Sequence, residues 1–222
     1  MLLEYLKANY KKGEPIFLKD VVDESGMESE SVKRGIRKLA SDGRIWRYSP
    51  GVYYFPKYSS VFKGHECYLK LPGYVVVECK YIGYRGKVQG YYSGNISMAN
   101  RFGLTTQIPA TEEITTNLIK RRRYEIQTID GFKFILHRAR TEINASNVKS
   151  LQFLELVTYA EKWIDWEPWF PSDWPEKKIN RCLKGFAKNN SLTKKMVYSL
   201  LDVFPAETAK NLFNNGYYRF LA

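Results

Sequence analysis

The chain has 222 residues and a formal net charge of +12, from 35 Lys+Arg against 23 Asp+Glu. Hydrophobic residues make up 44% and aromatic residues 15% of it, which excludes a disordered polycation and permits a buried core. The positive charge predicts a polyanionic partner, either a nucleic acid, a phosphate-rich ligand or an acidic protein.

Residues 1–58 are predicted to form three helices followed by a hairpin. Apolar spacing indicates helices over 2–9, 18–22 and 29–41, and strands over 44–48 and 52–55 that meet across Ser49-Pro50-Gly51. This order is the layout of a winged helix-turn-helix domain. In such a domain the helix after the turn enters the major groove of DNA, and the hairpin lies along the DNA backbone.

The helix predicted over 29–41 has one basic face. Its core side is formed by Val32, Ile36, Leu39 and Ala40, and four cations lie on the opposite arc. A solvated face with a Glu30–Arg34 pair is the alternative. Base edges are expected to be read from Glu28, Ser29, Ser31 and Lys33. The residues that we expect to bind DNA are Ser29, Ser31, Lys33, Arg34, Arg37, Lys38, Arg44, Arg47 and Tyr48.

Residues 59–222 are predicted to form a mixed α/β domain with a helical C-terminal part, so the fold class is α+β. Strands are expected over 74–78, 113–119, 124–129 and 132–137, and a helix over 93–102. Asp130-Gly131 predicts a tight turn between the last two strands. From about residue 147 the apolar pattern becomes helical.

Cysteine and histidine spacing excludes a disulfide framework and a zinc site. The three cysteines, Cys67, Cys79 and Cys182, are odd in number and widely spaced, and His65 and His137 lie far apart. We expect no metal and no cofactor. No run approaches the roughly 20 apolar residues that span a bilayer, and no secretory signal opens the chain. A cytoplasmic protein with reduced thiols and no membrane partner is therefore predicted.

Residues 93–110, SGNISMANRFGLTTQIPA, resemble the signature segment of the AbiE-type antitoxin family. In that family a Ser-Gly pair, a helix of small residues and a Leu-Gly-Leu-Thr/Ser-Thr-Gln-Val-Pro block follow an N-terminal winged helix. Residues 31–34, 42–45 and 51–54 also fit the family pattern, and the similarity covers about residues 15–140.

The resemblance implies an antitoxin of a bacterial type IV toxin–antitoxin system linked to abortive phage infection. Such proteins bind operator DNA and repress their own operon through the winged helix. Their C-terminal region counteracts a cognate nucleotidyltransferase-like toxin without forming a stable complex with it. No residue set in this sequence resembles a complete catalytic site, so the chain is not expected to be an enzyme.

The middle of the chain is its most electropositive part, because residues 61–140 hold 13 basic and 6 acidic side chains. The Lys120–Arg123 run lies on a predicted loop, where four adjacent cations favour an anionic neighbour. Each feature also has a purely structural interpretation: a solvated loop for the Lys120–Arg123 run, a helix cap for Ser93 and a structural turn for residues 105–107. The expected antitoxin or polyanion surface comprises Arg85, Lys87, Ser93, Gly94, Asn95, Thr105, Thr106, Gln107, Lys120, Arg121, Arg122 and Arg123.

Two alternative functions stay open. One is a transcriptional regulator with a ligand-sensing C-terminal domain. The other is a metal-dependent nuclease, because Glu78-x-Lys80 closes an apolar predicted strand in the way that half of such a site does. No carboxylate on a clear strand precedes this pair, which weighs against the nuclease.

Overall fold

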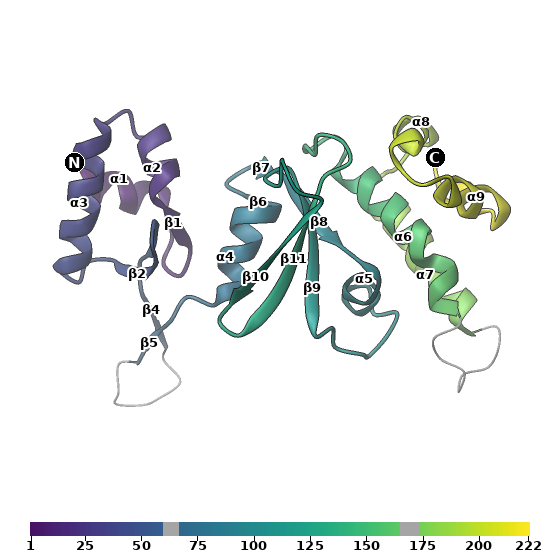
Figure 1. Cartoon of the computed structure of the whole chain (residues 1–222), viewed down its shortest axis with the longest axis horizontal. Helices are drawn as coiled ribbons and strands as arrows, with labels where there is room; N and C mark the ends of the chain where they lie inside the picture. Colours follow the sequence, from purple (N-terminus) through teal and green to yellow (C-terminus); the bar gives the residue numbers. More distant parts are fainter. Residues whose placement is uncertain (60–66, 165–173) are drawn as a thin grey trace. The chain divides into compact units, whose positions relative to one another are not determined.

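The chain is an α+β protein that divides into two compact units, Met1–Cys79 and Lys80–Ala222. The computed structural model (Figure 1) describes residues 1–59, 67–164 and 174–222. The first unit extends beyond the boundary expected at residue 58 because Leu71 and Val76 are buried in one cluster with Tyr54. Among the described residues, no helix is long and apolar enough to cross a membrane.

The first unit has the predicted order of three helices and a hairpin, together with three short strands that the sequence did not reveal. Its elements are α1 (Leu2–Asn9), β1 (Pro15–Phe17), α2 (Leu18–Glu24), α3 (Ser29–Ser41), β2 (Trp46–Ser49), β3 (Val52–Tyr54), β4 (Lys57–Ser59), β5 (Cys67–Leu69) and α4 (Gly73–Val77). Strands β1, β3 and β2 form an antiparallel sheet with β3 in the centre. The core is built from side chains that are at most 1% exposed: Leu6, Ile16, Val21, Val32, Ile36 and Ile45.

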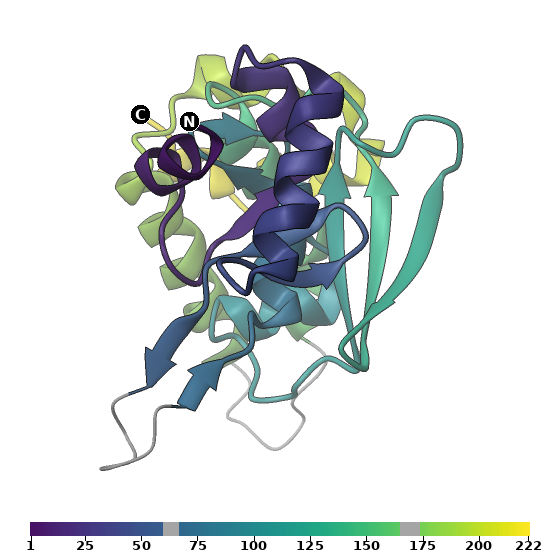
Figure 2. The ribbon, with the colours of Figure 1, turned by 90° about the vertical axis from the view of Figure 1, so that its left-hand side faces the viewer.

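Helix α3, which stands at the front of the first unit in Figure 2, packs on α1. Gly35 permits this approach, since a Cβ atom at that position would lie 2.5 Å from Cδ2 of Leu2. A side chain at residue 35 would therefore push the two helices apart or displace Leu2.

The strand predicted over 74–78 is wrong. Residues Gly73–Val77 form α4, and Glu78–Ile82 continue as the π-helix η1. Pro72 precedes the helix with φ −68°, a conformation suited to starting it. Val76 and Val77 are both buried while Tyr74 is 56% exposed, a pattern in which adjacent residues share one side. A strand would send adjacent side chains to opposite faces.

The second unit is a four-stranded sheet with helices on one side. Its first elements are β6 (Gly83–Tyr84), β7 (Lys87–Val88), β8 (Gly90–Ser93), α5 (Asn95–Arg101), β9 (Thr111–Thr116), β10 (Tyr124–Ile129) and β11 (Phe132–Arg138). The strand order is β10-β11-β9-β8, in which only the β11–β9 pair is parallel. The predicted hairpin across Asp130-Gly131 is confirmed, and both turn residues have positive φ.

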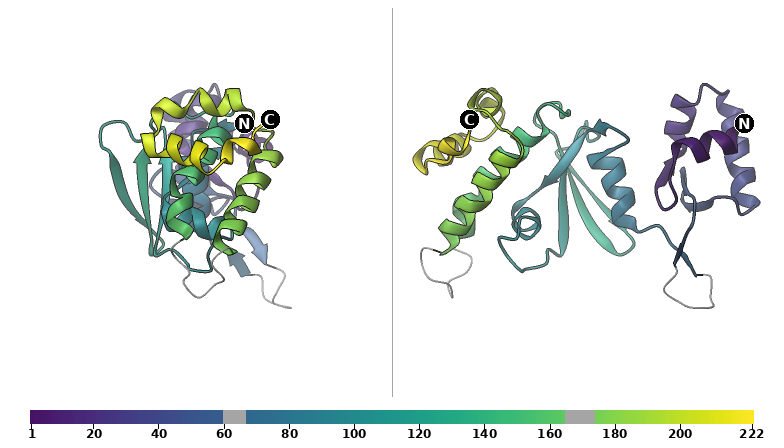
Figure 3. Two further views of the ribbon diagram at one scale, coloured as in Figure 1. Left: turned by 90° about the vertical axis from the view of Figure 1, so that its right-hand side faces the viewer. Right: turned by 180° about the vertical axis from the view of Figure 1, so that it is seen from behind.

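The C-terminal half is helical, as predicted. Its elements are α6 (Val148–Ile164), α7 (Trp174–Asn189), α8 (Lys194–Tyr198), η2 (Leu201–Val203), α9 (Ala206–Asn214) and η3 (Tyr217–Phe220). Figure 3 shows α5 and α6 on the same side of the sheet. Most of the α6 side chains from Leu151 to Ala160 are buried, which makes this helix the centre of the core.

Candidate functional site

Helix α3 begins at a cap supplied by Glu28. The Glu28 carboxylate accepts hydrogen bonds from the backbone N–H groups of Glu30 at 3.2 Å and Ser31 at 2.9 Å, and it also contacts the Ser31 hydroxyl. These bonds lower the pKa of Glu28, the bond from the Ser31 hydroxyl most of all. The Glu28 carboxylate is therefore engaged as a cap at the helix N-terminus.

The basic face of α3 is presented to solvent. Arg34, Arg37 and Lys38 are exposed, opposite the buried Val32 and Ile36. The acidic partner differs from the one expected, because Glu30 pairs with Lys33 (Nζ–Oε1 2.6 Å) rather than with Arg34. Ser29 is half-buried and Ser31 exposed at the start of the helix. The helix therefore offers three exposed cations whose charge no described ion pair offsets.

The β2–β3 hairpin adds two further cations. Arg44 precedes β2 and Arg47 lies within it, and both are exposed. The aromatic neighbours have structural partners: Trp46 contacts the ring of Tyr54 at a centroid distance of 6.0 Å, and Tyr48 lies beneath the Lys70 ammonium at 5.8 Å. The aromatic contacts thus brace the hairpin while its arginines reach solvent.

In the second unit, the topology gathers cations at one end of the sheet. Strands β9 and β11 end there, and β8 and β10 begin there. The Asn117 N–H donates to the Gln89 carbonyl at 2.8 Å, which ties the loop after β9 to the chain just before β8. We call this set the basic sheet end: Arg85, Lys87, Lys120, Arg121, Arg122, Arg123, Arg138 and Arg140.

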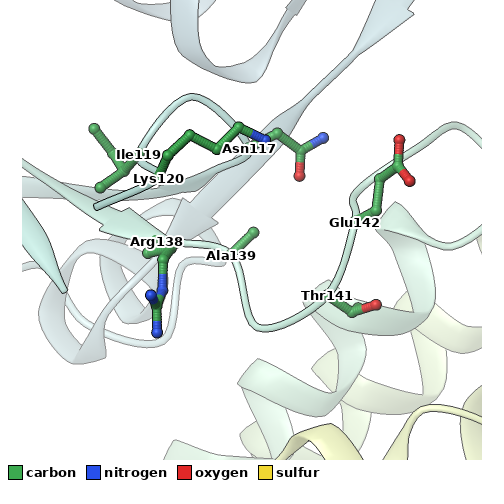
Figure 4. Close-up of a pocket in the computed structure, with 7 residues that line it drawn as sticks. All are labelled: Asn117, Ile119, Lys120, Arg138, Ala139, Thr141 and Glu142. Carbon is green, nitrogen blue, oxygen red and sulfur yellow. The ribbon is translucent and has the colours of Figure 1, made fainter. Parts of the chain in front are cut away.

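A pocket of about 420 Å³ lies at this end, between the loop after β9 and the segment after β11. Asn117 holds the two segments together, since its Nδ2 donates to the Ile143 carbonyl at 2.7 Å and its Oδ1 accepts from the Ile143 N–H at 2.9 Å. Figure 4 shows the Lys120 side chain extending toward Asn117 and Arg138 turned away from it. These two hydrogen bonds of Asn117 join the segments that border the pocket, so its polar lining has a structural role.

A second pocket, also of about 420 Å³, lies between the sheet and α6. We call it the sheet–helix pocket. Three exposed arginines contribute to its lining: Arg123, Arg138 and Arg140. Deeper residues come from β9, β11 and α6 and from the end of β8: Gly94, Glu113, Thr115, His137, Ala139, Glu155 and Tyr159.

Strand register explains the polar wall of the sheet–helix pocket. Thr115 is opposite His137 on β11, and Glu113 is opposite Ser93 on β8, so their side chains share one face of the sheet. The His137 Nε2 lies 2.7 Å from Glu113 Oε2, and the Thr115 hydroxyl donates to the Ser93 hydroxyl at 2.8 Å. A hydrogen-bonded polar network therefore occupies a sheet face that a helix covers.

The deep end of the sheet–helix pocket holds a buried acid, Glu155, which is 5% exposed. Burial raises its pKa, against the opposing effects of Arg140, the Gly94 N–H and His137. Burial and the Glu155 charge also raise the pKa of Tyr159 to about 12. A buried carboxyl with a perturbed pKa in a polar pocket is characteristic of a functional site.

The structure separates the predicted polyanion surface into three places. Gly94 and Arg123 line the sheet–helix pocket, and Ser93 lies behind Thr115. Asn95 accepts a bond from Trp163 Nε1 at 2.5 Å. The remaining cations, Arg85, Lys87, Lys120, Arg121 and Arg122, belong to the basic sheet end.

The segment 105–107 precedes β9 and so lies at the other end of that strand from Lys120. Thr105 Oγ1 accepts from the Gln107 N–H at 3.1 Å, and the Gln107 carbonyl accepts from Asn100 Nδ2 at 3.0 Å. Thr106 is exposed beside them. These bonds fix the segment locally, which agrees with a structural role for these residues.

Sequence reasoning missed eight residues of the sheet–helix pocket: Glu113, Thr115, His137, Arg138, Ala139, Arg140, Glu155 and Tyr159. Two signals were available. Glu155 interrupts the apolar run Phe153–Val157 on α6, and Glu113 and Thr115 alternate with apolar Ile114 on a strand. Each places a polar side chain where burial is expected.

In the described part of the chain, no three His, Cys, Asp or Glu side chains lie close enough together to hold a metal ion. Glu78 and Lys80 lie on the π-helix η1 rather than on a strand, which removes the sequence argument for a nuclease. Cys79 and Cys182 are free thiols, and burial raises the pKa of each to about 11. His65 lies outside the described residues.

Comparison of the chain with protein-family models, with curated proteins and with solved structures found no match. Its function is therefore inferred from its residues and their geometry.

Proposed function

We propose that the chain is a cytoplasmic antitoxin of the AbiE type, whose first unit is a winged helix-turn-helix that binds operator DNA and represses its own operon. The observation that carries this proposal is the α3 face, where Arg34, Arg37 and Lys38 are exposed opposite a buried apolar stripe. Arg44 and Arg47 extend the positive charge to the hairpin.

The cations and the small polar residues have different roles in this proposal. Lysine and arginine side chains neutralise DNA phosphates and supply affinity that falls with salt. Ser29, Ser31 and Lys33 lie in the first turns of α3, the part of a recognition helix that reads base edges in the major groove. Phosphate contacts position the protein, whereas base contacts select the operator.

The second unit has the antitoxin role in this proposal. It counteracts a nucleotidyltransferase-like toxin without a stable complex, as the resemblance of residues 93–110 implies. These residues run from the end of β8 through α5 to the start of β9, beside Gly94 of the sheet–helix pocket. The basic sheet end is the surface that we assign to a polyanion, because it concentrates eight cations at one edge of the fold.

Operator binding is tested with the double variant Arg34→Ala/Arg37→Ala in the full chain. Its affinity for the promoter of its own operon should fall, and the slope of log K against log salt should flatten by about 0.9 for each DNA phosphate that the variant no longer neutralises. Lys7→Ala/Lys11→Ala removes the same charge from outside α3 and the hairpin and is the matched control. An unchanged slope in the first variant would remove α3 from the DNA interface.

Antitoxin action is tested by co-expression with a nucleotidyltransferase-like gene adjacent to the one for this chain. Arg34→Ala/Arg37→Ala should lose repression of the promoter and still rescue growth. If both activities disappear in a variant that retains its thermal unfolding transition, repression and neutralisation share one surface and the division of roles is wrong.

A transcriptional regulator with a ligand-sensing C-terminal unit is the second candidate. The sheet–helix pocket favours it, because a concave site with converging polar groups is the usual form of a small-molecule site. Failure to rescue growth together with intact operator binding would favour this candidate over the antitoxin.

A further inference from the structure

We propose that the sheet–helix pocket binds a small ligand carrying a phosphate monoester, of the size of a nucleoside monophosphate. Arg123, Arg138 and Arg140 line one pocket. Within the described residues, none of the three forms an ion pair with a carboxylate. Arg140 interacts electrostatically with the buried Glu155 carboxyl, and the three neighbouring guanidinium groups together leave an excess of positive charge that favours a bound anion.

Each of the two carboxylates in the pocket has a hydrogen-bonding partner other than these arginines. Glu113 is engaged by His137, with 2.7 Å between Oε2 and Nε2. Glu155 lies at the buried end and is bonded to the Gly94 N–H. Arg140 also stacks on the Phe204 ring at 4.6 Å, an arrangement that holds its guanidinium in place. A phosphate dianion fits this excess of positive charge, and guanidinium groups bind it with paired hydrogen bonds.

The pocket also contains groups for the neutral part of such a ligand. Thr115, Tyr159 and Glu155 are polar side chains in its deeper part. Its volume of about 420 Å³ falls within the range of roughly 300–1,000 Å³ that is typical of small-molecule sites. A ligand with its phosphate at the exposed arginines and a hydroxyl or base directed inward matches this gradient from cationic to neutral polar lining.

Gly94 keeps the pocket open beside Glu113. Its φ is +81°, a conformation that side chains disfavour, and a Cβ atom there would collide with the Glu113 side chain. Glu113 in turn fixes the orientation of the His137 ring. The chain thus maintains a space of defined shape whose polar wall is held by its own hydrogen bonds.

The test is isothermal titration calorimetry of the full chain with adenosine 5′-monophosphate, with adenosine, with inorganic phosphate and with an unphosphorylated single-stranded oligonucleotide, meaning one that lacks a terminal phosphate monoester. We expect the monophosphate to bind and adenosine to bind at least about tenfold more weakly, since it lacks the charged group. Inorganic phosphate should compete with the monophosphate.

Two double variants with equal charge loss separate the pocket from the general charge of the surface. Arg123→Gln/Arg138→Gln removes two residues of the sheet–helix pocket and should weaken monophosphate binding at least about tenfold. Arg121→Gln/Arg122→Gln removes two exposed residues of the same loop that do not line the pocket and should change affinity less than about threefold. Arg123→Gln alone tests the site without altering the neighbouring pocket, which Arg138 also lines.

Three results would overturn the proposal: equal losses in the two double variants, adenosine binding as tightly as its monophosphate, or no monophosphate binding at millimolar concentration. Tighter binding of the unphosphorylated oligonucleotide would likewise indicate a diffuse polyanion surface. Arg34→Ala/Arg37→Ala should bind the monophosphate as the unaltered chain does. Failure of this inference is therefore distinguishable from failure of DNA binding.

Discussion

Helix α3 and the sheet–helix pocket both concentrate arginines, and they do so in opposite shapes. On α3 the cations project from one exposed helix face above a purely apolar stripe, with Val32 and Ile36 beneath them. In the pocket the arginines surround a concavity that leads to the buried Glu155. A projecting row of charge suits an extended polyanion, whereas a concave arginine site suits a single compact anionic group.

Net charge alone does not identify a partner. The polar residues that accompany the cations carry that information. Small hydroxyl side chains begin α3 and are suited to base edges, while His137, Glu113 and Tyr159 accompany the pocket arginines and provide hydrogen bonds in an enclosed space. Four sets of variants test how independent the two sites are.

The largest expected effect comes from shortening a buried side chain in the hydrophobic core of either unit. Ile36→Ala should destabilise the first unit by about 2–5 kcal/mol, because Ile36 is fully buried beneath the basic face of α3. It should weaken operator binding while monophosphate binding persists. Leu154→Ala, in the core of the second unit, should give the reverse pattern. Urea denaturation and the two binding assays measure this; loss of both activities in either variant would contradict independent sites.

Two glycine substitutions, one in each unit, should differ in their effect on stability and on monophosphate binding. Gly94→Ala combines a positive φ with a collision against Glu113 and should cost about 1–3 kcal/mol of stability together with monophosphate binding. Gly35→Ala meets only the end of the Leu2 side chain, and its improved helix propensity of about 1 kcal/mol offsets that contact. Thermal unfolding of the two variants provides the measurement, and equal destabilisation would refute the special role of Gly94.

The stability of the second unit should depend on pH through Glu155. Because burial raises the pKa of this carboxyl above its usual value of 4.5, the folded chain holds a proton that the unfolded chain releases. The resulting stabilisation is fully present below the unfolded pKa and is lost as pH rises through the folded one. Between pH 5 and pH 8 the urea midpoint should therefore fall less in Glu155→Gln than in the unaltered chain. Glu142→Gln, at an exposed residue, is the control, and identical profiles for all three proteins would contradict a protonated Glu155.

The smallest effect is expected from the surface pair on α3. Glu30→Gln breaks the ion pair with Lys33 and should cost at most about 0.5 kcal/mol, as exposed pairs of this spacing do. It also removes a negative charge beside the proposed DNA interface, so operator affinity should rise slightly at low salt. A fluorescence-anisotropy titration with operator DNA measures this, and a fall in affinity would mean that the ion pair positions Lys33.

Local pattern predicted several elements well. Helix α3 has the predicted bounds because an apolar stripe at helical spacing and the stop at Asp42-Gly43 agree with one another. The Asp130-Gly131 turn likewise fixed the β10–β11 hairpin. The segment 74–78 failed because a short apolar run suits a strand or a buried helix equally, and its tertiary neighbours selected the helix. Strands β1 and β8, of three and four residues, were too short to show alternation.

The amino-acid sequence alone predicts the basic face of α3, because residues close along one helix have a fixed spatial relation. It also determined the excess of positive charge in the middle of the chain. Only the tertiary structure decided that Arg123, Arg138 and Arg140 share a pocket with Gly94 and Glu155. Their meeting depends on the parallel β9–β11 pairing and on α6 covering that sheet face, and such long-range contacts are not encoded in the spacing of neighbouring residues.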